Sequence, residues 1–384
     1  MIIKNAVIHT ITNGTFSGYD LRIEDGKITN IRKILRVYPR EEVIEANGIN
    51  IFPGFIDAHS HIGLWEEAIG FEGNDTNEMT DPVTPQLRAI DSVNPMDEAF
   101  YEAIKGGVTT ACVTPGSANV IGGQAAVIRL HGRRVDDMVI DPYVAMKCAF
   151  GENPKRVYNS KNKAPQTRMG AVALMRETLF KAHRYMKLKE LANKDITKFP
   201  EFNIKYESLI PLLKGEVPFK AHAHRADDVF SAIRVAKEFR LKLTLDHCTD
   251  GHLIADYLKD EDYSAIVGPS FTSKTKFELK NKTFETPGIL TKAGVKVAIT
   301  TDSPITPLQY LPLCAALAVK SGMSELDALK AITIHPAEIL GLGDRLGSIE
   351  VGKDADLVFW EGHPFDVQSK VKAVYIKGEK IYEE

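Results

Sequence analysis

The feature that most constrains the fold is an alternation of short apolar runs with longer amphipathic stretches between residues 51 and 343. Eight runs have the length and composition of buried β-strands. They span residues 51–59, 108–116, 124–130, 142–150, 217–224, 241–248, 263–270 and 295–302. Helical patterns follow several of them, at 96–107, 164–187, 225–239 and 323–335. This alternation predicts an α/β fold, a (β/α)₈ barrel of the TIM type, in which 124–130 is the weakest strand.

Both ends of the chain show a different pattern. Residues 1–50 and 344–384 consist of short alternating runs separated by Gly and Asn, which is typical of β-strands joined by tight turns. Each end is too short to form a core by itself. We therefore expect the two ends to combine into one small β-sandwich domain, with the barrel of residues 51–343 inserted between them.

Charge and composition exclude several classes of partner. The net charge is −3 without a basic block, so we expect neither nucleic acid nor an anionic membrane as a partner. The chain has no apolar run of about 18 residues, and its start resembles a strand rather than a signal peptide. Four scattered cysteines without a CxxC pair favour a reducing, cytoplasmic location. A small molecule is the expected ligand.

The segment FPGFIDAHSHIG, residues 52–63, contains two histidines one residue apart after an apolar run. In an extended strand Asp57, His59 and His61 share one face. Two imidazoles on one face can bind a metal ion, and a nearby carboxylate can orient them. Taken alone, the segment is also compatible with two histidines that lie close together in a loop.

Further chemically active side chains lie at or near the ends of other predicted strands. In chain order the set is His59, His61, Lys147, His222, His224, His247 and Asp302. The chain has 11 histidines, and five of them are in this set, where chance would also scatter them over helices and loops. Because barrel active sites lie at the C-terminal ends of the strands, the set predicts a metal site.

These residues resemble the amidohydrolase superfamily over essentially the whole chain. PGFIDAHSH is similar to its first-strand HxH signature, TTDSP to its eighth-strand aspartate, and GSIEVGKDADLVFWEG to the strands that close its small β-domain. Within the superfamily the chain looks closest to the imidazolonepropionase-like group, which includes Xaa-Pro dipeptidases. The motifs are specific for the superfamily and weak for the substrate.

The resemblance implies a set of ligands for divalent metal, with zinc expected. His59, His61 and Asp302 would hold the more buried ion, and His222 and His247 a second one. His224 is an alternative to His222 in this role.

Lys147 decides whether one or two ions are expected. In binuclear relatives a lysine at this position is carboxylated and bridges both ions, and burial beside cations favours the neutral amine that this reaction needs. Without carboxylation, Lys147 would be an ordinary amine or pair with Glu152 in a mononuclear site. Glu66 or Glu67 as the bridge is a weaker alternative.

The expected mechanism is hydrolysis of a C–N amide bond by metal-activated hydroxide. Asp302 would act as general base and then acid, and His224 would bind the substrate carbonyl or the oxyanion. Arg225, Arg156 and Arg168, with Lys155 nearby, could bind a substrate carboxylate, which suits a dipeptide or an N-acyl amino acid, although basic loop residues also serve solvation alone. A cyclic amide is a further candidate substrate.

Two alternatives stay open at this point. One is a mononuclear deaminase or imidazolonepropionase-type ring hydrolase, which needs only His59, His61, one later histidine and Asp302. The other, a non-catalytic scaffold relative, is disfavoured because such relatives usually lose metal ligands. The resemblance also implies a homo-oligomer, without fixing the number of subunits.

Overall fold

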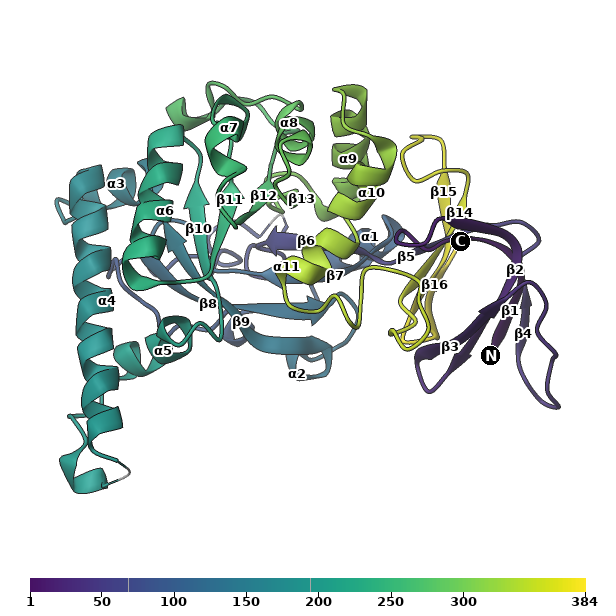
Figure 1. Cartoon of the computed structure of the whole chain (residues 1–384), viewed down its shortest axis with the longest axis horizontal. Helices are drawn as coiled ribbons and strands as arrows, with labels where there is room; N and C mark the ends of the chain where they lie inside the picture. Colours follow the sequence, from purple (N-terminus) through teal and green to yellow (C-terminus); the bar gives the residue numbers. More distant parts are fainter. Residues whose placement is uncertain (68, 194) are drawn as a thin grey trace.

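The computed structural model describes residues 1–67, 69–193 and 195–384. Its strands form two sheets of eight strands each, which lie side by side along the long axis of the molecule (Figure 1). One sheet is built from both ends of the chain, and the other is the barrel.

The sheet of the chain ends has the order β16-β15-β14-β5-β1-β2-β3, with β4 paired to β1. Its strands are β1 (Ile2–His9), β2 (Thr15–Glu24), β3 (Lys27–Arg32), β4 (Val43–Glu45), β5 (Asn50–Pro53), β14 (Leu357–Glu361), β15 (Lys370–Ile376) and β16 (Glu379–Glu383). The antiparallel pairing of β14 with β5 joins the two ends. The predicted second sheet from both chain ends is confirmed, and both termini lie within it (Figure 1).

The barrel sheet has the order β13-β12-β11-β10-β9-β8-β7-β6. Its strands are β6 (Phe55–Ser60), β7 (Val108–Val113), β8 (Ile121–Arg129), β9 (Val139–Ala149), β10 (Phe219–Ala223), β11 (Leu243–His247), β12 (Ser264–Val267) and β13 (Val297–Ile299). The expected TIM-type barrel is confirmed, but the strand predicted over 51–59 divides into β5 of the other sheet and β6 of the barrel.

Polar contacts close the barrel between its first and last strands. Asp57 accepts hydrogen bonds from the backbone nitrogen and the hydroxyl of Thr301 at 2.9 and 2.7 Å. Thr300 donates its hydroxyl to the carbonyl oxygen of His59 at 2.6 Å. These contacts hold the end of β6 against the segment after β13, and therefore fix the two candidate ligand segments relative to each other.

The direction of β8 differs from a regular (β/α)₈ barrel. This strand pairs antiparallel with both β7 and β9, while the remaining barrel pairs are parallel. The connections on its two sides are residues 114–120 and 130–138. A parallel crossover needs about a dozen or more residues, so segments of this length return the chain as hairpins.

The helices lie outside the barrel strands (Figure 1). They are α1 (Glu98–Lys105), α2 (Val135–Met138), α3 (Glu152–Asn159), α4 (Arg168–Leu191), α5 (Ile204–Leu213), α6 (Ala226–Phe239), α7 (Ala255–Leu258), α8 (Thr286–Lys292), α9 (Leu311–Lys320), α10 (Glu325–Ala331) and α11 (Ile334–Ile339). Single turns of 3₁₀-helix are η1 (Ala89–Asp91), η2 (Ile196–Lys198), η3 (Gly251–Leu253), η4 (Phe277–Leu279) and η5 (Leu308–Tyr310).

The helix expected over 323–335 is interrupted and forms α10 and α11 instead. Pro336 has no N–H to donate to the carbonyl of Ile332, as a continuous helix would require. That carbonyl instead accepts a hydrogen bond from the nitrogen of Ile56 in β6 at 2.9 Å. The interruption therefore ties the last helices to the first barrel strand.

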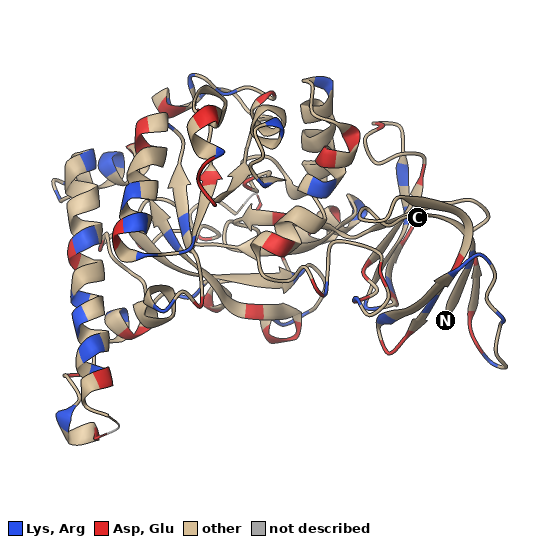
Figure 2. Ribbon diagram, viewed as in Figure 1, with Lys and Arg blue, Asp and Glu red and all other residues tan. Residues whose placement is uncertain are grey.

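Helix α4 extends past the ends of the barrel strands, as expected for its charged C-terminal half (Figure 1). Its buried side chains recur at helical spacing: Ala171, Met175, Leu179, Ala182 and Met186. Charged residues recur along the length of this helix (Figure 2).

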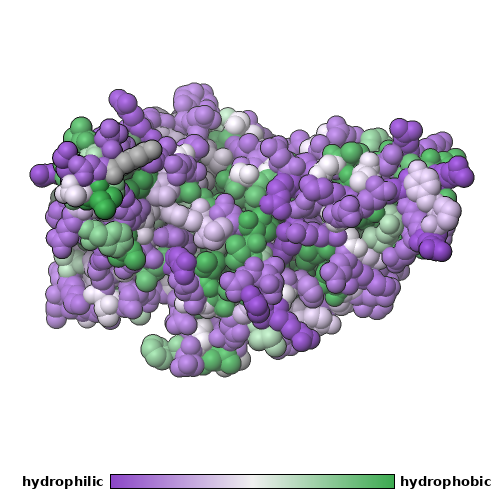
Figure 3. Space-filling view, turned by 90° about the horizontal axis from the view of Figure 1, so that it is seen from below, coloured by the Kyte–Doolittle hydropathy of each residue, from purple (hydrophilic) through white to green (hydrophobic). Residues whose placement is uncertain are grey.

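The molecular surface contains both hydrophobic and hydrophilic residues. Seen from below, hydrophobic residues lie in the middle of the face with hydrophilic residues around them (Figure 3). Within the described residues, no helix has the combination of length and apolar character that crossing a membrane requires.

Candidate metal centre

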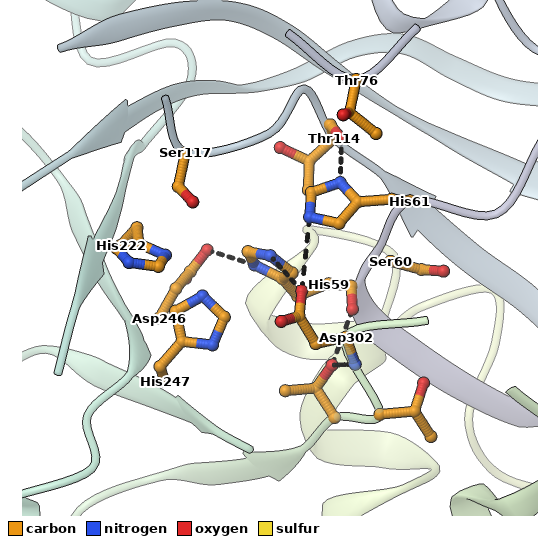
Figure 4. A network of polar contacts seen from close by, with 12 residues as sticks. His59, Ser60, His61, Thr76, Thr114, Ser117, His222, Asp246, His247 and Asp302 are labelled. Atoms are coloured by element: carbon orange, nitrogen blue, oxygen red, sulfur yellow. Dashed lines mark hydrogen bonds and ion pairs between the residues drawn. The ribbon is translucent and has the colours of Figure 1, made fainter. Parts of the chain in front are cut away.

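Two groups of potential metal ligands meet at the C-terminal ends of the barrel strands. His59, at the end of β6, and His61, just after it, lie with Asp302, which follows β13; the ligand atoms of this group are within 4.8 Å of one another. The second group, from β10 and β11, satisfies the same limit and consists of His222, His224 and His247. Figure 4 shows five of these side chains converging from their separate strands: His59, His61, His222, His247 and Asp302.

The hydrogen bonds of the imidazoles identify where their lone pairs point. His61 Nδ1 lies 2.6 Å from the carbonyl oxygen of Thr114, and His247 Nδ1 lies 2.7 Å from that of Gly268. A carbonyl oxygen only accepts, so in both rings Nδ1 carries the proton and Nε2 the lone pair. The Nε2 atoms are therefore the available ligand atoms.

Asp302 faces two such nitrogens. Its Oδ1 atom lies 3.3 Å from His59 Nε2 and 3.3 Å from His61 Nε2 (Figure 4). Because His61 Nε2 carries a lone pair, its approach to a carboxylate oxygen is repulsive unless a cation lies between them. The arrangement fits a metal ion at this point.

Three buried atoms of the two groups support the same conclusion. Among the described residues, Asp302 Oδ1, His247 Nε2 and His222 Nδ1 have no hydrogen-bond partner. Buried polar atoms in proteins nearly always have one. A cation in each group would satisfy all three, so the residues present fit divalent metal.

Backbone strain marks the same two strand ends. His247 and Asp302 have positive φ angles of 71° and 54°. A residue other than glycine rarely adopts this conformation, and such residues cluster at functional sites. Directly after β12, Gly268 has a φ of 146°, and a Cβ there would lie 2.1 Å from the oxygen of Thr300. Glycine therefore allows the close approach that brings its carbonyl to His247.

The alternative between His222 and His224 can be compared atom by atom. His224 Nδ1 lies 2.7 Å from the hydroxyl of Thr249, and its Nε2 lies 3.6 Å from Glu278 Oε1. Among the described residues His222 Nδ1 has no partner, and its Nε2 lies 3.3 Å from the side-chain nitrogen of Asn153 and 3.8 Å from the same Glu278 oxygen. The geometry favours His222 as the ligand and His224 as its neighbour, and both roles stay predictions.

Burial keeps these imidazoles neutral. It lowers the pKa of His224 to about 4 and that of His222 and His247 well below the usual value. The pKa of His61 is lowered for the same reason. The lone pairs are thus available near neutral pH.

Lys147 on β9 lies beside the first group. It is fully buried, and its Nζ lies 3.2 Å from His59 Nε2. Burial lowers the pKa of Lys147 to about 8, although Asp246 and Asp302 act in the opposite direction. A large share of the amine is therefore uncharged near pH 8. The expected alternative partner Glu152 instead accepts a hydrogen bond from the nitrogen of Glu278 at 3.3 Å.

Two carboxylates have roles that the sequence did not indicate. Asp57 was expected to orient the first-strand imidazoles, but it binds the backbone nitrogen of His59 and Thr301. The carboxylate that contacts the His59 ring is Asp246 on β11, whose Oδ2 lies 2.6 Å from Nδ1. Lys220 on β10 donates to Asp246 at 3.3 Å. Charged residues within the apolar runs of these strands, LTLDH and FKAHA, were the available signal.

The predicted substrate-binding arginines have partners or point outward. Arg168 forms two hydrogen bonds with Asp228, at 2.8 and 3.1 Å. Arg225 does the same with Asp227, at 2.9 and 2.8 Å. Arg156 lies exposed on α3. Their role toward substrate stays a prediction.

The alternative bridging acids lie on the loop after β6. Glu66 accepts a hydrogen bond from the Asn94 side chain at 2.6 Å. Burial beside other acids raises the pKa of Glu67. Glu66 therefore already has a partner of its own.

A cavity of about 720 Å³ lies at the opposite end of the barrel. Its lining includes residues that precede barrel strands, such as Glu216, Lys242 and Lys296. The candidate ligands lie at the C-terminal strand ends, where barrel enzymes hold their active sites. We therefore assign the functional site to the ligand groups and not to this cavity.

Comparisons with known proteins cover both sheets. A model of the amidohydrolase family matches residues 221–381. The crystal structure of an amidohydrolase from Thermotoga maritima MSB8 is 44% identical, with 100% of both chains covered and a TM-score of 0.97. Amidohydrolase tasK from Hapsidospora irregularis is 30% identical over 94% of this chain, which spans 39% of the length of tasK. An imidazolonepropionase from Mesorhizobium japonicum is 25% identical over 88% of this chain and 83% of its own.

Proposed function

Because the chain belongs to the amidohydrolase family, we propose that it is a metal-dependent hydrolase that cleaves a C–N amide bond. The candidate substrates are a dipeptide, an N-acyl amino acid or a cyclic amide. One observation carries the proposal: buried, unpartnered ligand atoms of Asp302, His247 and His222 converge at the C-terminal end of the barrel.

Each ligand group would hold one divalent ion, for which we propose zinc. His59, His61 and Asp302 would bind the first ion, and His222 and His247 the second. Imidazole and carboxylate ligands suit zinc, although other divalent metals share this preference. A bound divalent metal lowers the pKa of water from 15.7 to about 7 and polarises a carbonyl group.

Lys147 is the proposed link between the two groups. Its Nζ atom lies 3.2 Å from His59 Nε2 of the first group, and β9, which carries it, pairs with β10, whose His222 belongs to the second. The neutral amine can add carbon dioxide, lose a proton and become an anionic carbamate with two oxygen atoms. This product would offer one oxygen to each group.

Asp302 is the proposed proton carrier. A divalent ion held by Asp302 would favour the ionised form of this carboxylate. The carboxylate can take a proton from the attacking water and deliver it to the leaving nitrogen.

His224 is the proposed group for the substrate carbonyl. It is neutral, and the Thr249 hydroxyl holds its Nδ1 atom. With the hydroxyl donating to Nδ1, the Nε2–H is a donor for the oxygen that becomes negative during the reaction.

A second candidate function is a mononuclear deaminase or imidazolonepropionase-type ring hydrolase. The similarity to imidazolonepropionase supports it, as does the buried carboxylate of Glu278 beside His222 and His224. In this case Lys147 would stay an ordinary amine, and one ion would suffice.

Metal analysis combined with a substrate screen tests the proposal. Purified protein is loaded with zinc, and its metal content is measured. It is then assayed against dipeptides, N-acyl amino acids, cyclic amides and aminated purines and pyrimidines. Two equivalents of metal and amide hydrolysis that a chelator abolishes are expected. One equivalent with ring opening or deamination supports the second candidate, and metal-free protein without hydrolytic activity contradicts both.

A further inference from the structure

The loop after β12 places a cation beside the second ligand group. Lys276 precedes η4, and its Nζ atom donates to Glu278 Oε1 at 3.0 Å and to Asn153 Oδ1 at 3.2 Å. The Lys276 side chain is 25% exposed, whereas Glu278 is fully buried. An ammonium group has three donors, and the described residues use two of them.

Glu278 and Asn153 connect this ammonium group to the imidazoles. The Oε1 atom of Glu278 that binds Lys276 also lies 3.6 Å from His224 Nε2 and 3.8 Å from His222 Nε2. The amide nitrogen of Asn153 lies 3.3 Å from His222 Nε2. A single side chain, that of Glu278 or of Asn153, thus links Lys276 to the imidazoles of the proposed reaction centre.

Both partners are themselves held in place. The Oε2 atom of Glu278 accepts a hydrogen bond from the nitrogen of Glu152 at 3.1 Å, and Asn153 donates to Ser117 at 2.8 Å. These contacts join the segments that follow β7, β9 and β12. The position of Lys276 is therefore fixed by the scaffold, as a specificity residue requires.

Other cations near the site have different partners. The guanidinium groups of Arg168 and Arg225 each form two hydrogen bonds with one aspartate of α6. Lys276, in contrast, is held by Glu278 and Asn153, which also lie beside the imidazoles of the second ligand group.

We infer that Lys276 binds a carboxylate of the substrate, so that the enzyme selects dipeptides or N-acyl amino acids over their neutral amides. This inference rests on the proposed amide hydrolysis and names its substrate class.

The test compares acids with their primary amides. Metal-loaded wild-type protein and Lys276→Gln, Lys276→Arg and Lys280→Gln variants are assayed with N-acetyl-L-leucine and Met-Pro and with the primary amide of each. Release of acetate or methionine is measured. Lys280 is the matched control, because it is exposed on the same loop.

The expected result is a change in the acid-to-amide ratio of kcat/KM. Wild type prefers the acids, and Lys276→Gln lowers the ratio about 10- to 100-fold, mainly through KM. Lys276→Arg retains most of the preference because it keeps the charge, and Lys280→Gln keeps the wild-type ratio. A ratio unchanged in Lys276→Gln, with both activities lowered equally, would overturn the inference.

Binding measurements separate this inference from the proposed reaction. If wild type hydrolyses none of the four compounds, the proposed reaction fails for them, and calorimetric titration with N-acetyl-L-leucine and its amide still tests Lys276. Binding of the acid about tenfold weaker in Lys276→Gln, without a matching loss for the amide, supports the inference. Equal acid binding by both proteins, or none by wild type, refutes it.

Discussion

His59 Nδ1 lies 2.6 Å from Asp246 Oδ2, although the two residues are 187 positions apart in the chain and belong to different barrel strands. Both side chains are fully buried. The contact leaves His59 Nε2 directed at Asp302 and thus prepares a ligand atom before any metal arrives.

We predict that Asp246→Asn weakens metal binding about 10- to 100-fold, because a neutral amide orients and polarises the imidazole less well than a carboxylate. Competition with a chromophoric chelator measures the affinity. The exposed Asp260→Asn variant is the control and should bind metal as wild type does. Unaltered affinity in Asp246→Asn would show that the His59 contact does not support a metal site.

A second prediction concerns Lys147. Since burial lowers its pKa to about 8, its neutral fraction rises as the pH increases toward that value. Protein loaded with metal at pH 8 should gain activity when bicarbonate is added to carbon dioxide-free buffer. The Lys147→Met variant should retain about one metal equivalent instead of two and lose activity about 100-fold or more.

The readouts for Lys147 are metal content and the ¹³C NMR signal of a carbamate after incubation with labelled bicarbonate. Lys259→Met, which changes an exposed lysine, is the control. Two retained equivalents in Lys147→Met would contradict the proposed link through Lys147, and no carbamate signal in wild type would favour the mononuclear candidate.

The pH dependence of stability is a third prediction, made for metal-free protein. The unfolded chain protonates His224 near pH 6.5, but the folded protein does so only near pH 4 because of burial. The unfolded state therefore binds more protons below pH 6.5, and stability falls as the pH decreases from 6.5 to 4. At pH 5 this single group costs about 2 kcal/mol.

Urea denaturation at pH 7 and pH 5 checks this effect. The free energy of unfolding should fall less in His224→Gln than in wild type, and the difference isolates His224 from other groups that titrate in this range. The same decrease in both proteins would contradict the prediction.

A fourth prediction concerns the junction of the two sheets. Arg129 at the end of β8 binds Asp354 at 2.7 Å and Asp356 at 3.1 Å, both in the segment before β14. Removing the guanidinium group deprives the two buried carboxylates of the cation between them. Arg129→Ala should therefore destabilise the protein by about 3–5 kcal/mol. Denaturant titration measures the change.

The exposed pair of Arg88 and Asp91 provides the control for the junction. Arg88→Ala should alter the free energy of unfolding by less than about 1 kcal/mol. A similarly small effect in Arg129→Ala would mean that the junction does not depend on this ion pair.

The barrel could be predicted because burial of its strands leaves a direct trace in the sequence, namely apolar runs such as 108–113 and 243–247. The direction of β8 could be predicted only in principle, from the short connections 114–120 and 130–138. The runs themselves do not encode strand direction. The split between α10 and α11 required attention to Pro336 rather than to the hydrophobic period.

The candidate site was predictable where a residue type has few other uses at a strand end, as for His59, His61 and Asp302. It was not predictable where an ordinary acid acquires its partner across the barrel, as Asp246 on β11 does with His59 on β6. Glu278 and Lys276 lie on a loop without periodicity. The chemical role of these two residues depends on which strand ends lie beside that loop in the folded protein.

The antiparallel course of β8 also determines which segments around the ligand groups can change in sequence and length. The hairpin connection 114–120 is anchored in strands on both sides and presents Ser117 and the Thr114 carbonyl as a fixed wall. The segment between β12 and α8, in contrast, is long enough to change in length and composition without disturbing a strand pair. An effort to redirect this protein toward other molecules should therefore remodel the latter segment and leave the hairpin intact.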